Sequence, residues 1–171
     1  MIRTDLKEPL QVDTGGLRGE LPLKNSQKEQ ILQYIKLIES GAPKKVGIIR
    51  WVDERQLNTG YSPGFELLQI GSDVMPATLS RGTGTLTANT RLTWKGSIAH
   101  ELVGHREAAL AMKTQLESPQ EEAQASIRAA FFAPSLTNTE RYTLLRDAIT
   151  RLNKAGLSIR QVKHLLHINK R

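Results

Sequence analysis

The sequence predicts an α+β protein in which a small sheet is followed by a helical half. Short apolar runs with strand-like composition are confined to residues 45–89. From residue 91 onward, apolar residues recur at helical spacing, and start and stop signals separate one helical segment from the next. Because strands and helices are segregated along the chain and do not alternate, an α+β arrangement is favoured over a parallel α/β sheet.

The chain length predicts one domain. At 171 residues the chain can bury a core without disulfides or other staples. Residues 1–25 mix glycine, proline and scattered charge, and we expect them to form an N-terminal arm or linker. Residues 26–171 are then a single α+β domain that carries the candidate site.

The first half is expected to contain one helix and a few strands. Ser26-Gln27-Lys28-Glu29 matches a capping box and predicts a helix that Gly41 ends. Strands are expected at residues 45–52 and 65–70, with a Gly/Pro loop between them around residues 61–64. One or two further edge strands are expected in the Thr-rich segment 78–89.

The second half is expected to be helical. A second capping box, Ser118 to Glu121, carries proline at the first helical position, and Gly156 is a stop signal. Four helices are predicted, over residues 91–113, 119–132 and 139–153 and from Ser158 onward.

Composition excludes several classes of protein. The chain has no cysteine, which rules out a disulfide framework, a thiolate zinc site and thiol catalysis. No apolar run approaches the ~20 residues that a membrane-spanning helix needs, and the first residues have no signal-peptide core. The net charge is +7, and residues 139–171 hold eight Lys/Arg against two acidic residues. Such a basic C-terminus can attract nucleic acid, an anionic membrane or an acidic protein partner, and composition does not choose among them.

One segment carries chemistry, Ala99-His100-Glu101-Leu102-Val103-Gly104-His105. Neutral imidazoles and a carboxylate bind hydrolytic zinc, and a glutamate beside the first histidine can act as general base. The common spacing is i, i+4, whereas these histidines are five residues apart and would lie about 140° apart on an ideal α-helix. A π-bulge would bring both histidines to one side, and Gly104 tolerates such a distortion.

The segment resembles the His-Glu-x-x-Gly-His signature of dipeptidyl peptidase III, a zinc peptidase whose active helix carries the extra residue. Glu121-Glu122-Ala123-Gln124-Ala125 matches the Glu-Glu-x-x-Ala motif of the same family. The resemblance implies that His100, His105 and Glu122 hold Zn²⁺ and that Glu101 is the general base. It covers residues 98–126, and Arg106-Glu107-Ala108 stands where the family has Gly-Ser-Gly.

The chain as a whole resembles small zincin-like domains that occur as secreted bacterial effector or toxin modules. This resemblance implies a zinc endopeptidase acting on proteins or peptides, as a domain of a larger secreted protein. An acidic inhibitor or immunity protein docking on the basic C-terminus is the partner that it implies.

Other interpretations stay open. Transition-state stabilisation needs a further side chain, for which Tyr142 is favoured over Arg128, His164 and His167. Glu121 and Glu122 could instead only stabilise the N-terminus of their helix, where negative charge is favoured by the helix dipole. A metal-independent RNase toxin would use His100 or His105 as acid and base, with Arg106 and the basic C-terminus binding phosphates. A basic interaction module without catalysis is a third possibility.

Overall fold

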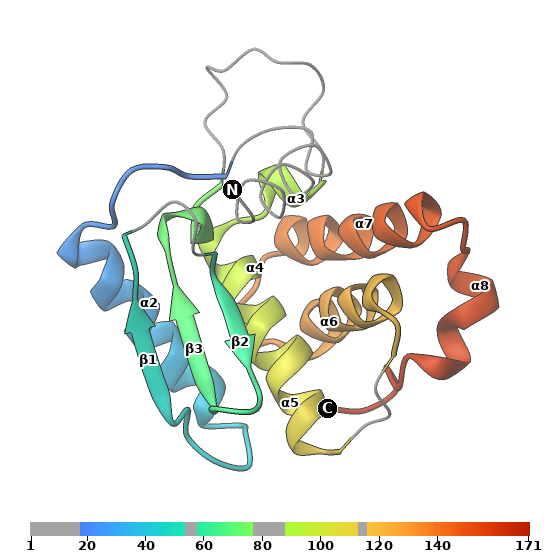
Figure 1. Ribbon diagram of the computed structural model, residues 1–171, viewed down its shortest axis with the longest axis horizontal. Coiled ribbons are helices and arrows are strands. Elements are labelled where there is room, and N and C mark those ends of the chain that lie inside the picture. Colours follow the sequence, from blue (N-terminus) through green and yellow to red (C-terminus); the bar gives the residue numbers. More distant parts are fainter. Residues whose placement is uncertain (1–17, 54–57, 77–87, 113–115) are drawn as a thin grey trace.

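The fold is that of a computed structural model, which describes residues 18–53, 58–76, 88–112 and 116–171 (Figure 1). The described strands are β1 (Ile48–Trp51), β2 (Gly60–Ser62) and β3 (Leu67–Ile70). The described helices are α2 (Asn25–Glu39), α3 (Ala88–Arg91), α4 (Trp94–Ala99), a π-helical segment (His100–Arg106), α5 (Glu107–Leu110), α6 (Ser118–Phe132), α7 (Asn138–Lys154) and α8 (Ile159–Val162). The predicted α+β class, with a small sheet before a helical half, is confirmed.

The sheet has the strand order β1-β3-β2, with β1 parallel and β2 antiparallel to β3. α2 lies behind it, and the helical half lies beside β2 (Figure 1). Isoleucines of α2 and alternate residues of β3, notably Leu68 and Ile70, are buried in one core that extends to α4 and α6. The sheet is thereby fixed against the helix that carries the two histidines.

The predicted strands 45–52 and 65–70 are present in shortened form, and one strand was missed. β2 occupies part of the predicted loop 61–64, where Tyr61 pairs with Leu68 of β3. Of the predicted strand segment 78–89, residues 78–87 lie outside the described residues, and Ala88 and Asn89 belong to a helix. The strand prediction is therefore wrong for these two residues.

Arg18 joins the supposed arm to the domain. Its guanidinium donates to the backbone carbonyls of Asp73, Val74, Asn89 and Leu92 at 2.7–2.9 Å and to the Ser97 hydroxyl at 2.8 Å. These contacts hold the end of α3 against the start of α4. The domain therefore includes residues before the boundary predicted at residue 26.

The predicted helix 91–113 is wrong at both ends, because Arg91 closes the separate helix α3, α4 begins only at Trp94, and α5 ends at Leu110. α2 begins after Lys24, whose backbone N–H is bound by Gln27, so the cap predicted at Ser26 is wrong. The N-cap of α6 is Glu117, one residue before the predicted Ser118. Ser158 is the N-cap of α8, as predicted.

The C-terminal segment is not one long helix. α8 passes into a 3₁₀ turn that ends at Leu165, and the chain then runs back over α6. Gln124 binds the carbonyl of Leu166 at 2.6 Å, and Arg128 binds those of His167 and Lys170 at 2.9 Å. None of the described helices has the length and apolarity needed to cross a bilayer.

Candidate metal centre

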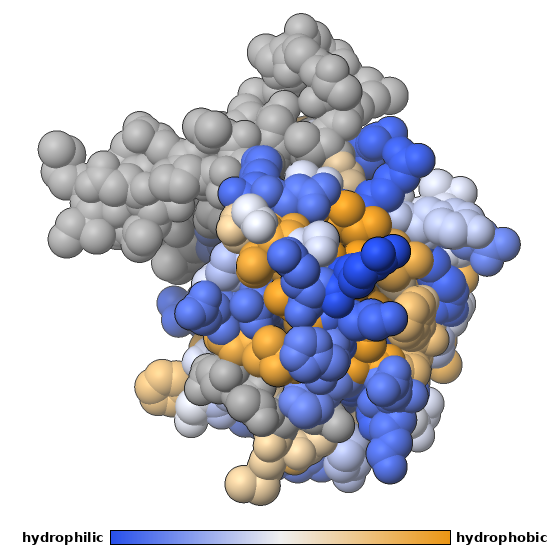
Figure 2. All heavy atoms as spheres, turned by 90° about the vertical axis from the view of Figure 1, so that its right-hand side faces the viewer, coloured by the Kyte–Doolittle hydropathy of each residue, from blue (hydrophilic) through white to orange (hydrophobic). Residues whose placement is uncertain are grey.

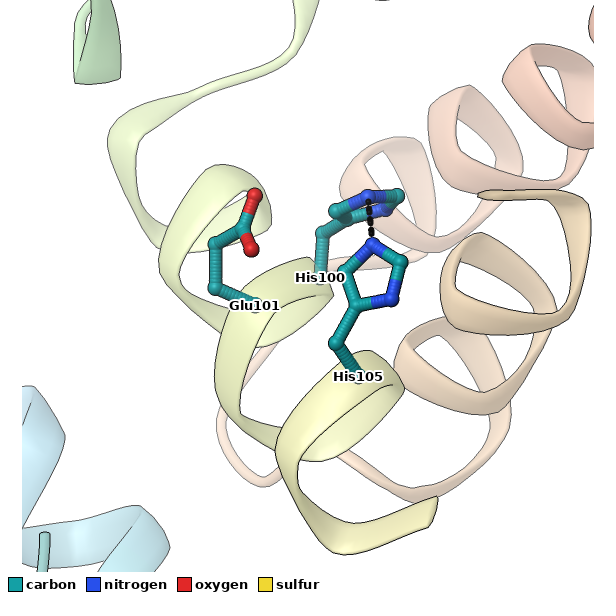
Figure 3. A group of neighbouring side chains, drawn as sticks. All are labelled: His100, Glu101 and His105. Carbon is teal, nitrogen blue, oxygen red and sulfur yellow. Dashed lines mark hydrogen bonds between the residues drawn. The ribbon is translucent and has the colours of Figure 1, made fainter. Parts of the chain in front are cut away.

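The two histidines lie on one side of the active helix because its central part is π-helical. The π-helical segment covers His100–Arg106 and lies between two α-helical segments. This is the distortion that a metal shared by two histidines five residues apart would require. The two imidazole rings are nearly perpendicular, with 83° between their planes, and their Nε2 atoms lie 3.1 Å apart (Figure 3). Two neutral imidazoles in this position can direct two lone pairs at one ion.

Gly104 allows α6 to approach this helix closely. A Cβ atom at Gly104 would lie 2.4 Å from the carbonyl oxygen and 2.6 Å from the Cα of Ala125. No side chain fits there without moving backbone. The glycine of the motif is therefore required for the contact between the π-helical segment and α6.

That contact brings Glu122 to the histidines. Its Oε2 lies 2.7 Å from Nε2 of His105, and its Oε1 lies 3.5 Å from Nε2 of His100. In a tetrahedral zinc site with bonds of about 2.0–2.1 Å, neighbouring ligand atoms lie about 3.3 Å apart. The contacts among the two Nε2 atoms and the two oxygens of Glu122 range from 2.7 to 3.5 Å around this spacing, so the side chains can supply three ligands to one ion.

Glu101 competes with Glu122 for the role of carboxylate ligand. Donor atoms of His100, Glu101 and His105 all lie within 4.8 Å of one another. However, Oε2 of Glu101 accepts a 3.0 Å hydrogen bond from the backbone N–H of Tyr61, and its carboxylate lies to one side of the imidazole pair (Figure 3). Glu122 makes the shorter contacts to the imidazoles, which suits a ligand, whereas Oε1 of Glu101 lies beside the cluster, which suits a proton acceptor.

The electrostatics agree with these roles. Burial raises the pKa of Glu101, which makes it a stronger base than an exposed glutamate. Burial opposes ionisation of Glu122, but the two neighbouring histidines, of which His105 is in the closer contact, hold its pKa well below the usual range. Burial would lower the pKa of His105, yet the hydrogen bond to Glu122 and nearby carboxylates raise it to about 9. A metal binding at neutral pH therefore replaces a proton on His105.

Three side chains around the cluster were missed by the sequence reasoning. Nδ1 of His100 lies 2.9 Å from the Ser126 hydroxyl, which donates to Asp147 at 2.7 Å. Arg151 donates from Nε to the same carboxylate oxygen at 2.9 Å, and its Nη1 lies 3.7 Å from Glu122. Helical spacing could have indicated these residues. Ser126 follows Glu122 by four residues and Arg151 follows Asp147 by four, so each pair shares one face of its helix.

Tyr142, the predicted transition-state residue, is not at the cluster. It is 66% exposed, and it precedes Arg151 on α7 by nine residues. Nine residues correspond to about 180° around an α-helix and ~13 Å along it, so Tyr142 is on the opposite face of α7. The prediction for Tyr142 is wrong because the face of α7 that meets α6 is set by Leu144, Asp147 and Ala148.

The remaining candidates for transition-state stabilisation or phosphate binding also lie away from the histidine pair. Arg128 is fully buried and binds the C-terminal backbone, whereas His164 and His167 are exposed. Arg106 is fully buried and is ion-paired at 2.6 Å with Glu66. None of these four side chains contacts the histidine pair in the part of the chain that is described.

The predicted basic C-terminus is only partly a free charged surface. Arg171 makes a two-point ion pair with Glu107, and Arg141 binds two carbonyls at the end of α6. Hydrophilic side chains cover much of the face formed by α7 and α8, with apolar atoms between them (Figure 2). The exposed basic residues of this region include Arg146, Arg160, Lys163 and Lys170.

No family model, curated protein or solved structure matches the chain. The likeness to dipeptidyl peptidase III therefore rests on two short motifs, and the function has to be argued from the chemistry of the cluster.

Proposed function

We propose that the protein is a zinc-dependent peptidase that hydrolyses peptide bonds in protein or peptide substrates. The observation that supports the proposal is the close approach of three side chains, His100, His105 and Glu122, whose ring nitrogens and carboxylate oxygens make contacts of 2.7–3.5 Å with Glu101 beside them. Two histidines and one glutamate are a ligand set of catalytic zinc sites, which keep a further position for water or substrate.

A zinc ion held by these three side chains would polarise a substrate carbonyl and bring the pKa of a bound water to about 7. Glu101 takes a proton at Oε1 from the attacking water and returns it to the nitrogen of the leaving amine. The Tyr61 N–H holds the other oxygen of Glu101 at 3.0 Å, which keeps the base oriented through both transfers.

The position of β2 supports a peptide substrate. β2 is the edge of the described sheet next to the active helix, and Glu101 binds its backbone. An extended peptide can add to such an edge through main-chain hydrogen bonds, here with backbone groups other than the Tyr61 N–H that Glu101 occupies, and this would hold a scissile bond near the cluster. Protein substrates are therefore the partners proposed first, and an acidic inhibitor binding at Arg160, Lys163 and Lys170 remains a proposal.

The RNase alternative has less support. Arg106, its expected phosphate ligand, is fully buried in an ion pair with Glu66. The histidines lie among Glu101 and Glu122, whose negative charges repel a phosphodiester. Arg151 and Arg171, which were counted among the basic residues, are held by carboxylates.

Chelator-sensitive proteolysis is the test of this proposal. We expect the purified chain to degrade a denatured protein mixture, to stop when 1,10-phenanthroline removes zinc, and to recover when zinc is restored. Total RNA in a parallel reaction should stay intact. RNA degradation that persists in chelator, without proteolysis, would overturn the peptidase and favour the RNase.

A further inference from the structure

A series of buried polar side chains connects two of the proposed ligands on the side away from the donor atoms. It runs from Nδ1 of His100 to the Ser126 hydroxyl at 2.9 Å, and from that hydroxyl to Oδ2 of Asp147 at 2.7 Å. His100, Ser126 and Asp147 are all buried, where polar side chains need hydrogen-bond partners, and Ser126 lies between the other two. This series joins the π-helical segment to α6 and α7.

The proton positions along this series follow from the chemistry of its members. A carboxylate only accepts hydrogen bonds, so the single hydroxyl proton of Ser126 goes to Asp147. The Ser126 oxygen is then an acceptor toward His100, and Nδ1 of His100 must carry the proton. In a neutral ring this leaves the Nε2 lone pair free, and Nε2 is the nitrogen that faces His105 and Glu122.

Arg151 connects the same carboxylate to a second ligand. Oδ2 of Asp147 accepts from both Ser126 and Nε of Arg151, while Nη1 of Arg151 lies 3.7 Å from Oε1 of Glu122. Asp147 is almost fully buried and Arg151 is its ionic partner, which fixes the direction of the guanidinium. One aspartate thereby orients His100 through Ser126 and orients Glu122 through Arg151.

We propose that Ser126, Asp147 and Arg151 are positioning residues that prepare the metal site before metal binds. Ser126 and Asp147 hold His100 in the Nδ1–H tautomer, and Arg151 holds Glu122. The proposal rests on the proposed zinc site for its effect on affinity, but the tautomer is a property of the metal-free protein. Outer partners of this kind commonly change metal affinity by about 10- to 100-fold when they are removed.

The experiment measures the tautomer and the zinc affinity separately. The ¹⁵N shifts of the His100 ring are recorded in metal-free protein at a pH where the ring is neutral, and zinc affinity is measured by competition with a chromophoric chelator. We expect Nδ1–H in the wild type. Ser126→Ala should populate the Nε2–H form and weaken zinc binding by about 10- to 100-fold. Arg151→Met should weaken zinc binding without changing the His100 tautomer.

Gln124→Ala is the matched control. Gln124 is also a buried polar residue of α6, but its side chain donates a hydrogen bond to the Leu166 carbonyl and not to a proposed metal ligand. It should lower stability while leaving tautomer and zinc affinity unchanged. An Nε2–H ring in the wild type, or a Ser126→Ala protein with wild-type tautomer and affinity, would overturn the positioning role. Wild-type protein that shows the Nδ1–H ring but binds no zinc would instead contradict the proposed function and leave the orientation of His100 standing.

Discussion

Replacing Glu101 with Gln is expected to lower peptide hydrolysis by roughly 10²- to 10⁴-fold, the usual contribution of a positioned general base. Zinc content should stay unchanged, because Glu101 is a base beside the cluster and not a ligand. The glutamine carbonyl can still accept the Tyr61 N–H, which Oε2 of Glu101 now accepts at 3.0 Å. Steady-state kinetics and elemental analysis of the same preparation measure both quantities.

His105→Ala is the comparison for this variant. It removes a nitrogen that lies 3.1 Å from His100 and 2.7 Å from Glu122, and both zinc and activity should be lost together. If Glu101→Gln loses zinc as His105→Ala does, Glu101 is a ligand and the assignment of the two glutamates has to be exchanged.

Gly104→Ala is expected to separate α6 from the active helix. The new methyl group would lie 2.4–2.7 Å from the carbonyl oxygen, Cα and Cβ of Ala125, and two of these atoms are backbone. Overpacking of this kind costs about 1–3 kcal/mol or more. Because Glu122 is three residues before Ala125, the same displacement moves it away from His105. A lower urea midpoint and weaker zinc binding are both expected.

Gly64→Ala is the matched control, since nothing lies within 4 Å of a Cβ at Gly64. Its stability and zinc affinity should stay close to those of the wild type. A Gly104→Ala protein that kept wild-type stability and zinc affinity would contradict the close packing of the π-helical segment on α6.

The site could be predicted from sequence where the chemistry is local. His100 and His105 are five residues apart, and only a π-type distortion lets one helix present both to one ion, so the motif itself implied the local geometry. Glu122 came from the resemblance of a second motif. The contact between Gly104 and Ala125 then explains physically why that residue reaches the histidines.

The features that sequence did not reveal depend on long-range packing. β2 has only three residues. It is held in place by its pairing with β3 and by the hydrogen bond from the Tyr61 N–H to Glu101. The fold around Arg18 depends on carbonyls more than fifty residues away along the chain. Tyr142 was predicted to stabilise the transition state because it carries a hydroxyl group. The face of α7 that meets α6 is instead formed by the buried Asp147 and its neighbours. Helical periodicity shows which residues share a face, and it does not show which neighbour that face meets.

The number of zinc ions bound per chain decides whether the proposed metal centre exists. Wild-type protein purified without added metal, or titrated with zinc in metal-free buffer, should hold about one zinc ion per chain, and His100→Ala, His105→Ala and Glu122→Ala should each lose most of it. A wild-type chain that neither carries zinc nor binds added zinc would contradict the proposed zinc site. Zinc that is retained unchanged in all three variants would contradict it as well.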